Sequence, residues 1–370
     1  MLAKMPHSLP PHSAPRHAKA FAKSRRGHNL TAMLVTDPSA APAAVPSEVA
    51  TPYRPADRYG FIDGAGGRLR VAIWNASGTA RGSVVLLGGR GEFVEKYATE
   101  VVGELLGRGF AVLSMDWRGQ GLSSRLLADR DKGHIDDFAT YVADLKLFFD
   151  TVLEPATPRP VIALAHSMGG HIVLRAIAEH GPGPLAAAML VSPMTGLTRE
   201  VLLRRVLAIV PRVRCLDERY LFGSGPYVTV SRSFAINDLT HDERHFRFTD
   251  QWFSADPRLT LGGVTIGWAR QALRSMHRAH TAGYFEHIPL PIMLLSGSED
   301  TVVDIASHEA VAARLAHVEW VLLRGARHEI MMETDPIRAL FWQAFDRLAK
   351  DTTRQACLPP PLPGHTIIER

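Results

Sequence analysis

"PVIALAHSMGGHIVLRAIAEH", residues 160–180, is the stretch that decides the fold. It begins as an apolar run, breaks into small residues around Ser167, and continues with the spacing of a helix. A serine nucleophile on a sharp strand-to-helix turn needs small residues two positions before and after it, because the backbone passes close to both. Ala165 and Gly169 are both small, although the usual G-x-S-x-G motif has glycine twice. The alternative is a serine that merely caps a helix, and the pattern favours the nucleophile.

Short apolar runs lie on both sides of this stretch, and helix-like segments separate several of them. We expect strands over 68–76, 83–89, 110–117, 160–167, 186–192, 291–297 and 318–325. We expect helices over 93–109, 136–153 and 337–350. Continuous apolar runs are typical of buried strands in a parallel sheet. The sequence therefore predicts an α/β fold with a doubly wound, mostly parallel sheet.

The alternation fails between residues 195 and 286, which predicts a helical cap inserted into the core. The core would then consist of residues 55–194 and 287–350. An insertion that follows the carboxyl end of a strand would cover a site there. Residues 1–54 are rich in Pro, Ala, Ser and His and are expected to be disordered, and residues 351–370 are expected to form an irregular tail.

The net charge of +5 comes from the start of the chain, where residues 1–36 hold six basic residues and no acidic one. Such a start is typical of a transit peptide, but a true start at Met33 is the favoured interpretation. The remaining chain is almost neutral, which argues against a nucleic-acid partner. Cys215 and Cys357 lie far apart and suggest no disulfide framework. No run reaches the ~18 apolar residues of a membrane span, so a cytoplasmic location is expected.

A serine nucleophile needs a general base and an acid that orients it, each on a loop after a later strand. Asp300 follows the strand that ends near Gly297, and His328 follows the last predicted strand. Both therefore lie at the carboxyl edge of the sheet, in the order serine, acid, histidine. Asp304 is a weaker candidate for the acid, because it begins the next predicted helix.

An oxyanion hole needs one backbone amide after the nucleophile and one from the loop after an early strand. Met168 would supply the first amide. Arg90, in the glycine-rich "GGRGEF" loop, would supply the second. The alternative is a phosphate-binding loop, but the loop lacks the third glycine of G-x-G-x-x-G and the Lys-Ser/Thr of a P-loop. No cofactor is expected.

Five motifs together resemble the α/β-hydrolase superfamily, and more narrowly its lysophospholipase and monoacylglycerol lipase branch with the serine-aminopeptidase-like hydrolases. They are "LLGGRGEFVEKY" (86–97), "MDWRGQGLSS" (115–124), "AHSMGGHI" (165–172), "GSEDTVVD" (297–304) and "GARHEIMME" (325–333). The resemblance implies that Ser167 is the nucleophile, Asp300 the acid and His328 the base. It implies oxyanion amides at Arg90 and Met168, and a cap that forms the acyl pocket. Many relatives have His-Gly at positions 88–89 and Gly at position 165, which concerns substrate preference more than activity.

The expected activity is hydrolysis of a lipid ester through an acyl-enzyme, with a lysophospholipid as the favoured substrate. The alternatives are a monoacylglycerol lipase, a small-ester carboxylesterase, and, less favoured, a hydrolase fold used only for binding. Candidate substrate contacts are Arg204, Arg205, Trp252 and Trp268. The alternative for the tryptophans is that they fill the cap's own small core, which is the favoured role for most such residues. The basic cap segment would touch a headgroup or the inner face of a membrane, or would simply be a solvated helix face.

A metal site is not expected. The segment "HDERH" (241–245) places two histidines four residues apart, as in the zinc-protease motif. That motif needs glutamate directly after the first histidine, and Asp242 occupies the position here.

Overall fold

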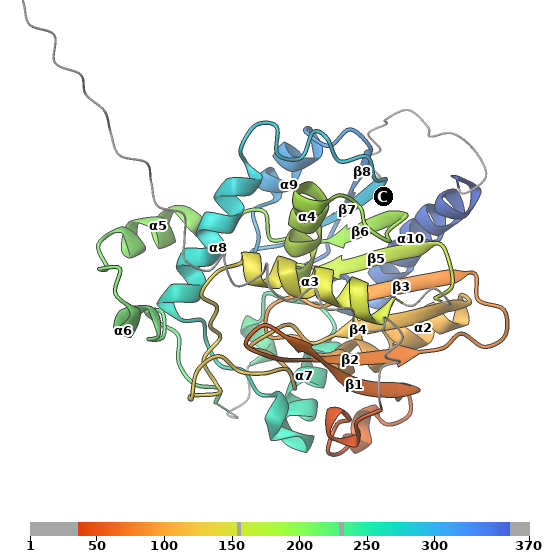
Figure 1. The fold of residues 1–370 in the computed structure, drawn as a ribbon, viewed down its shortest axis with the longest axis horizontal. Coiled ribbons are helices and arrows are strands. Elements are labelled where there is room, and N and C mark those ends of the chain that lie inside the picture. Colours follow the sequence, from red (N-terminus) through yellow and green to blue (C-terminus); the bar gives the residue numbers. More distant parts are fainter. Residues whose placement is uncertain (1–35, 154–156, 229–232, 356–370) are drawn as a thin grey trace, which may run out of the picture. The chain divides into compact units, whose positions relative to one another are not determined.

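An eight-stranded sheet forms the centre of the protein in the computed structural model, which describes residues 36–153, 157–228 and 233–355 (Figure 1). The strand order is β1-β2-β4-β3-β5-β6-β7-β8; β1 pairs antiparallel with β2, β2 antiparallel with β4, and all other pairs are parallel. The strands are β1 Arg58–Gly64, β2 Gly67–Trp74, β3 Gly82–Leu87, β4 Phe110–Met115, β5 Val161–His166, β6 Ala187–Val191, β7 Ile292–Gly297 and β8 Val318–Leu323. This is the doubly wound α/β fold that the sequence predicts.

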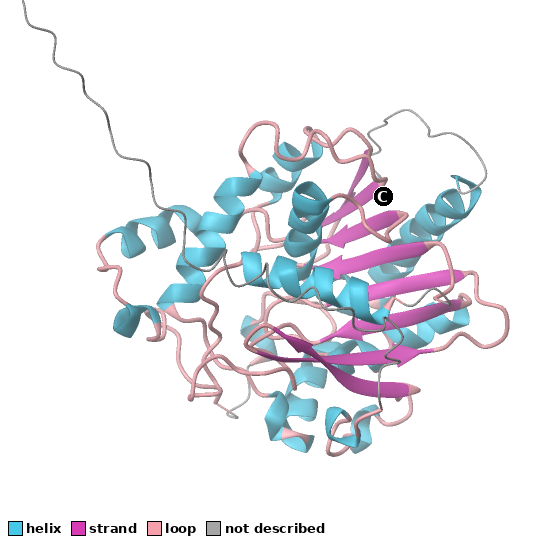
Figure 2. Ribbon diagram, in the orientation of Figure 1, coloured by secondary structure: helices cyan, strands magenta, loops and turns pink. Residues whose placement is uncertain are grey.

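Helices cover both faces of the sheet, as the cyan and magenta of Figure 2 show. The core helices are α1 Val94–Ala98, α2 Val101–Gly107, α3 Ala139–Val152, α4 Met168–His180, α9 Ile305–Ala312 and α10 Asp335–Gln355. Side chains of α3, α4 and α9 pack on one face, and those of α1, α2 and α10 pack on the other. The central strand β5 serves both layers, because Ala163 faces the first and Leu164 the second. Burial on two faces explains why these strands are continuous apolar runs.

Two local expectations differ from the structure. Strand β1 was not expected, because its sequence "RYGFIDG" carries two glycines and two charges, which an edge strand tolerates. The expected single helix over 93–109 is divided into α1 and α2 at Glu100, whose backbone leaves the helical region. The Glu100 carboxylate instead pairs with Arg244 (2.6 Å) and Arg338 (2.9 Å) from later parts of the chain.

Between β6 and β7, where the sequence predicts a cap, the described residues form four α-helices: α5 Glu200–Ala208, α6 Arg214–Asp217, α7 Glu243–Ala255 and α8 Ile266–Ala279. Helix α7 packs against the core, since the Phe253 ring lies 5.3 Å from the ring of Phe93. The loop before α8 is hydrogen-bonded to the core loop at Gly133, whose amide donates to Gly263 O (3.0 Å) and whose carbonyl accepts from Thr265 N (2.9 Å). Helices α5 and α6 instead contact α8.

Residues 36–54 correct the expectation of disorder up to residue 54. They contain two short 3₁₀ helices, Pro38–Ala40 and Ser47–Val49, and bury Ala40, Val49 and Tyr53 against the core. The amide of Ala43 donates to Asp256 Oδ2 (2.8 Å), next to α7. The order of this segment could not be predicted from its proline- and alanine-rich composition, because its few apolar side chains do not recur with the period of a helix or a strand. The expected start at Met33 and most of the expected tail lie outside the described residues.

The C-terminal boundary also moves, because α10 continues to Gln355, beyond the expected end at residue 350. Across the three described ranges, no helix is both long and apolar enough to cross a membrane.

The packing of residues 36–54 can be tested at Tyr53. This side chain is buried, its ring lies edge-on to Trp252 at 5.0 Å, and its hydroxyl bonds to that of Tyr59 (2.8 Å). We expect Tyr53→Ala to lower the free energy of unfolding by about 3 kcal/mol, as large-to-small changes in cores do. Urea unfolding measures this, with the exposed Val45→Ala as a control that should change little. Equal stability of the two variants would show that the segment does not pack.

Candidate active site

Ser167 lies on the sharp turn that the sequence predicts, between β5 and α4. Its φ is 50° and its ψ is −116°, a strained backbone for a residue with a side chain. The turn brings α4 so close to the loop after β3 that a Cβ on Gly169 would lie 2.5 Å from Gly88 O. Position 169 therefore requires glycine. Ala165 is fully buried within β5 and paired with β3 and β6, so its methyl group is accommodated.

His328 joins Ser167 to Asp300 through two hydrogen bonds. Its Nε2 lies 3.0 Å from Ser167 Oγ, and its Nδ1 lies 2.8 Å from Asp300 Oδ2. An ionised carboxylate only accepts, so Nδ1 carries a proton and Nε2 is free to accept the serine proton. All three side chains are buried. The three residues come from loops at the carboxyl ends of β5, β7 and β8, where the sequence places them.

Asp300 is held as a carboxylate. Burial alone would raise its pKa, but the hydrogen bond from His328 and those from the amides of Val303 (3.0 Å) and Val302 (2.8 Å) together hold the pKa below its ordinary value. Asp304 instead caps α9, where it accepts from the amide of Ala306 (3.1 Å). The structure thus separates the two acids that the sequence offers, and Asp300 is the one beside the histidine.

The amides expected to form the oxyanion hole are at Arg90 and Met168. On either side of Arg90, the Gly89 amide donates to Glu92 and the Gly91 amide donates to Gln120. Within the described part of the chain, the amides of Arg90 and Met168 have no hydrogen-bond acceptor. Met168 also begins α4, where the helix dipole favours negative charge. Two free amides beside a serine are the arrangement that an oxyanion needs.

Ser167 and His328 line a cavity of about 360 Å³. Most of its other lining is apolar and comes from the loops and the cap, including Met194, Leu197, Phe253, Leu261 and Trp268. Trp268 thus lies where the sequence predicts a substrate contact. Such a lining suits a hydrocarbon chain.

Three other expected contacts do not line this cavity. Trp252 is fully buried in the core because α7 turns its apolar side inward, and its Nε1 donates to Thr99 Oγ1 (3.1 Å). Arg204 and Arg205 are exposed on α5, and Arg204 Nε donates to Glu200 Oε1 (2.7 Å). Their location corrects the expectation of direct contact with the bound substrate.

A buried charge network, formed by Glu92, Lys96, His166 and Glu329, lies beside the serine and was not foreseen. Lys96 Nζ bonds to Glu92 Oε1 (2.8 Å) and to Glu329 Oε1 (2.6 Å). The ring nitrogens of His166 face Glu92 Oε2 (3.0 Å) and the carbonyl of His328 (3.1 Å). Both partners only accept, so His166 is an imidazolium that donates to each. The network connects the loop after β3, the serine turn and the His328 loop.

The charges in this network stabilise one another. Burial lowers the pKa of His166, but the Glu92 carboxylate outweighs it, and the net effect raises the pKa. Burial raises the pKa of Glu92, but Lys96 and His166 together hold it well below its ordinary value. The spacing of Glu92 and Lys96 is that of an ordinary surface ion pair on a helix, so their burial could not be predicted from the sequence pattern.

The histidines of "HDERH" do not converge on a metal site. His241 Nδ1 lies 2.9 Å from Glu333, whereas His245 Nε2 lies 2.9 Å from Glu100. No group of three ligating side chains occurs among the residues whose placement is described.

The fold and this site define a serine hydrolase of the α/β-hydrolase fold. More narrowly, the chain belongs to the serine aminopeptidase S33 family, which matches residues 78–335. Lysophospholipase L2 of Escherichia coli strain K12 is 34% identical over 267 residues, which cover 70% of this chain and 77% of that protein. Human monoglyceride lipase is 26% identical over 251 residues, which cover 66% of this chain and 73% of that protein. A crystal structure of a monoglyceride lipase variant from Saccharomyces cerevisiae has the same fold, with a TM-score of 0.64 and 20% identity over 80% of this chain and 94% of that one.

The buried charge network makes stability depend on pH. Between the ordinary histidine pKa of about 6.5 and the higher folded value, the folded protein holds a proton on His166 that the unfolded chain has released. The free energy of unfolding therefore falls as the pH rises through this range. We expect Glu92→Gln to cost about 3 kcal/mol and to flatten that fall, because it removes the partner that raises the pKa.

Urea unfolding at several pH values on both sides of about 6.5 measures the effect. Glu104→Gln is the matched control, since Glu104 forms an exposed ion pair with Arg108 (2.5 Å). The pH dependence of this control should match the wild type. The same fall with pH in Glu92→Gln would contradict the assignment of the proton to His166.

Proposed function

We propose that this protein is a carboxylic ester hydrolase that releases the fatty acid of a lysophospholipid through an acyl-enzyme on Ser167. The observation that carries the proposal is the hydrogen-bond chain from Ser167 through His328 to Asp300, at the wall of an apolar cavity. A serine hydroxyl with a neutral imidazole as acceptor and a carboxylate behind it is the arrangement that activates serine for acyl transfer.

The reaction has two halves. His328 Nε2 takes the Ser167 proton while Oγ attacks the ester carbonyl, and Asp300 stabilises the imidazolium that forms. The amides of Met168 and Arg90 donate to the oxyanion, which collapses as the imidazolium gives its proton to the leaving alcohol. Water then attacks the acyl-enzyme with the same base, and the fatty acid leaves.

The substrate class rests on the cavity and on the relatives. The cavity wall is mostly apolar, which favours an acyl chain. The lysophospholipase L2 relative is more similar to this chain than the human monoglyceride lipase, which favours a lysophospholipid over a monoacylglycerol. Monoacylglycerol hydrolysis is the second candidate, because the monoglyceride lipases match over a similar length.

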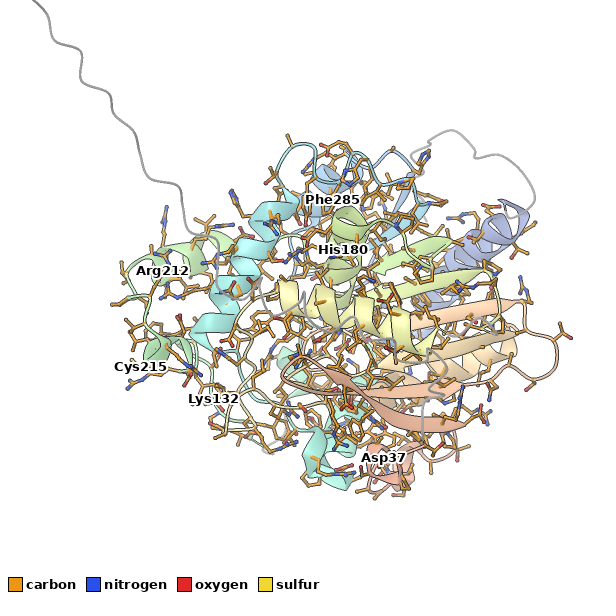
Figure 3. The ribbon with its side chains drawn as sticks, in the orientation of Figure 1. Asp37, Lys132, His180, Arg212, Cys215 and Phe285 are labelled. Carbon is orange, nitrogen blue, oxygen red and sulfur yellow. The ribbon has the colours of Figure 1, made fainter. Side chains whose placement is uncertain are left out.

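The cap presents a second feature that suits a lipid substrate. Helix α5 and the turn after it expose Val201 (66%), Leu202 (61%) and Ile209 (84%) to solvent. Arginines lie among them, and Figure 3 shows Arg212 on this outer part of the cap. Apolar side chains interspersed with cations fit the surface of an anionic membrane. We propose that this surface, Val201–Arg212, docks on such a membrane; the cytoplasmic location expected from the sequence stays a prediction.

The activity can be tested with two lipids that carry the same acyl chain, a lysophosphatidylcholine and a monoacylglycerol. We expect fatty-acid release from both, faster from the lysophospholipid, and a loss of about 10⁴-fold or more in Ser167→Ala. Release of fatty acid is measured by titration, and circular dichroism checks the fold of the variant. Substantial turnover by Ser167→Ala would refute the role of Ser167, and activity on neither lipid would refute the substrate class.

Membrane docking can be tested by sedimentation with phosphatidylglycerol vesicles. We expect Leu202→Asp and Ile209→Asp each to weaken binding by about tenfold, because each removes an apolar side chain that docking would bury and adds a charge of the same sign as the lipid headgroups. Added salt should weaken wild-type binding as well. Val45→Asp is the control, since Val45 is also exposed (40%) and its segment lies away from α5 (Figure 1). Equal binding by all four proteins would refute docking through Val201–Arg212.

A further inference from the structure

Arg90 is a cation in the wall of the active-site cavity that lacks a carboxylate partner. Its Nη2 donates to the carbonyl of Gly262, and its buried Nε has no hydrogen-bond partner. The guanidinium lies 6.0 Å from the ring centre of Trp268, another residue of the cavity wall. No carboxylate of the described chain forms an ion pair with it.

The fully buried Arg70 and Arg118 are paired with carboxylates. The partly buried Arg125, like Arg90, bonds only to backbone carbonyls, but it does not line the cavity. Arg70 bonds to Glu95 and lies 3.2 Å from Asp116, and Arg118 lies 2.6 Å from Asp144. Burial without an anion is costly for a charged group, and it lowers the pKa of Arg90 to about 10. Arg90 still carries its charge at neutral pH. A cation held in this way, at a cost in stability, is characteristic of a functional site.

The cavity offers Arg90 no free counter-charge. Its two acids, Glu92 and Glu329, both bond to Lys96, and Glu92 also bonds to the imidazolium of His166. The two negative charges of Glu92 and Glu329 thus balance the two positive charges of Lys96 and His166. The charge of Arg90 is left without a counter-charge in the cavity lining.

The Arg90 side chain lies between two loops, one in the core at Gly133 and one in the cap at Gly262. A Cβ on Gly133 would lie 2.8 Å from Arg90 Nη2, so glycine leaves the room that the guanidinium occupies. The carbonyl of Gly262 accepts from the same nitrogen. These loops are bonded to each other through Gly262 N and Asp131 O (2.8 Å). The guanidinium is therefore fixed by backbone from both the core and the cap.

We propose that Arg90 binds the phosphate of the lysophospholipid headgroup and makes the enzyme favour lysophospholipids over monoacylglycerols. The inference rests on the proposed function and adds a role for a side chain whose backbone amide faces the oxyanion. The glycerol that separates the scissile ester from the phosphate is about as long as the side chain that separates the Arg90 amide from its guanidinium. One residue is therefore long enough to reach both ends of the glycerol. Guanidinium and phosphate match in charge and in hydrogen-bond geometry.

The test compares kcat/KM for lysophosphatidylcholine and for a monoacylglycerol with the same acyl chain, both in neutral detergent micelles. We expect Arg90→Met to lower the ratio of the two values at least about tenfold, the loss of one charge-assisted pair. Arg90→Lys keeps the charge and should recover part of the ratio. Arg274→Met, on the exposed side of α8, should leave the ratio unchanged. An equal loss on both lipids in Arg90→Met would overturn the proposal, and thermal unfolding reports whether the variants fold.

A second measurement keeps this proposal separate from the choice of substrate. Hydrolysis of p-nitrophenyl butyrate is followed in the presence of glycerol 3-phosphate, glycerol or oleate. We expect glycerol 3-phosphate, and not glycerol, to inhibit the wild type, and this inhibition to weaken at least about tenfold in Arg90→Met. That result would support the phosphate site even if neither lipid is a substrate. Inhibition that depends on Arg90 for oleate but not for glycerol 3-phosphate would overturn it, because the anion would then be a fatty-acid carboxylate.

Discussion

A buried network of four charges holds together the three loops that form the active site. Through its salt bridges and hydrogen bonds, the loop that offers the Arg90 amide is fixed to the turn that presents Ser167 and to the loop that presents His328. Each charge is deeply buried and is tolerable only because its partners are present. The positions of the serine, the histidine and the amides proposed to bind the oxyanion are therefore coupled, and the remaining sheet serves to bring the three loops to one edge.

The sequence was most informative where geometry restricts the residue type. Ser167, Asp300 and His328 could be found because each follows a recognisable strand, and parallel strands end at one edge of a sheet. The requirement for glycine at position 169 follows from the same turn. Asp300 could be preferred over Asp304 because it follows its strand closely and because Asp304 begins the next predicted helix, and the hydrogen bond to His328 agrees with that choice.

The parts that escaped prediction depend on contacts between distant segments. Glu92 and Lys96 have the spacing of a solvated pair, and their burial arises from Glu329 and His166, which no local pattern connects to them. Trp252 is of a residue type that could line a pocket, yet its ring packs on the ring of Tyr53. Tyr53 belongs to residues 36–54, whose composition suggested disorder. Periodicity reports which face of an element is apolar, but it does not report which partner covers that face.

The cap has two parts, which differ in how they are attached to the rest of the protein. Helix α7 and the loop before α8 are joined to the core by aromatic packing and by backbone hydrogen bonds, each worth about 1 kcal/mol. Lifting the whole cap as a rigid lid would break all of these contacts together. Helices α5 and α6 contact α8 instead, and Arg270 of α8 donates to the carbonyls of Leu207 and Val210 at the end of α5. The outer part of the cap, α5 and α6, is thus attached to the protein mainly through α8, the helix that carries Trp268 of the cavity wall.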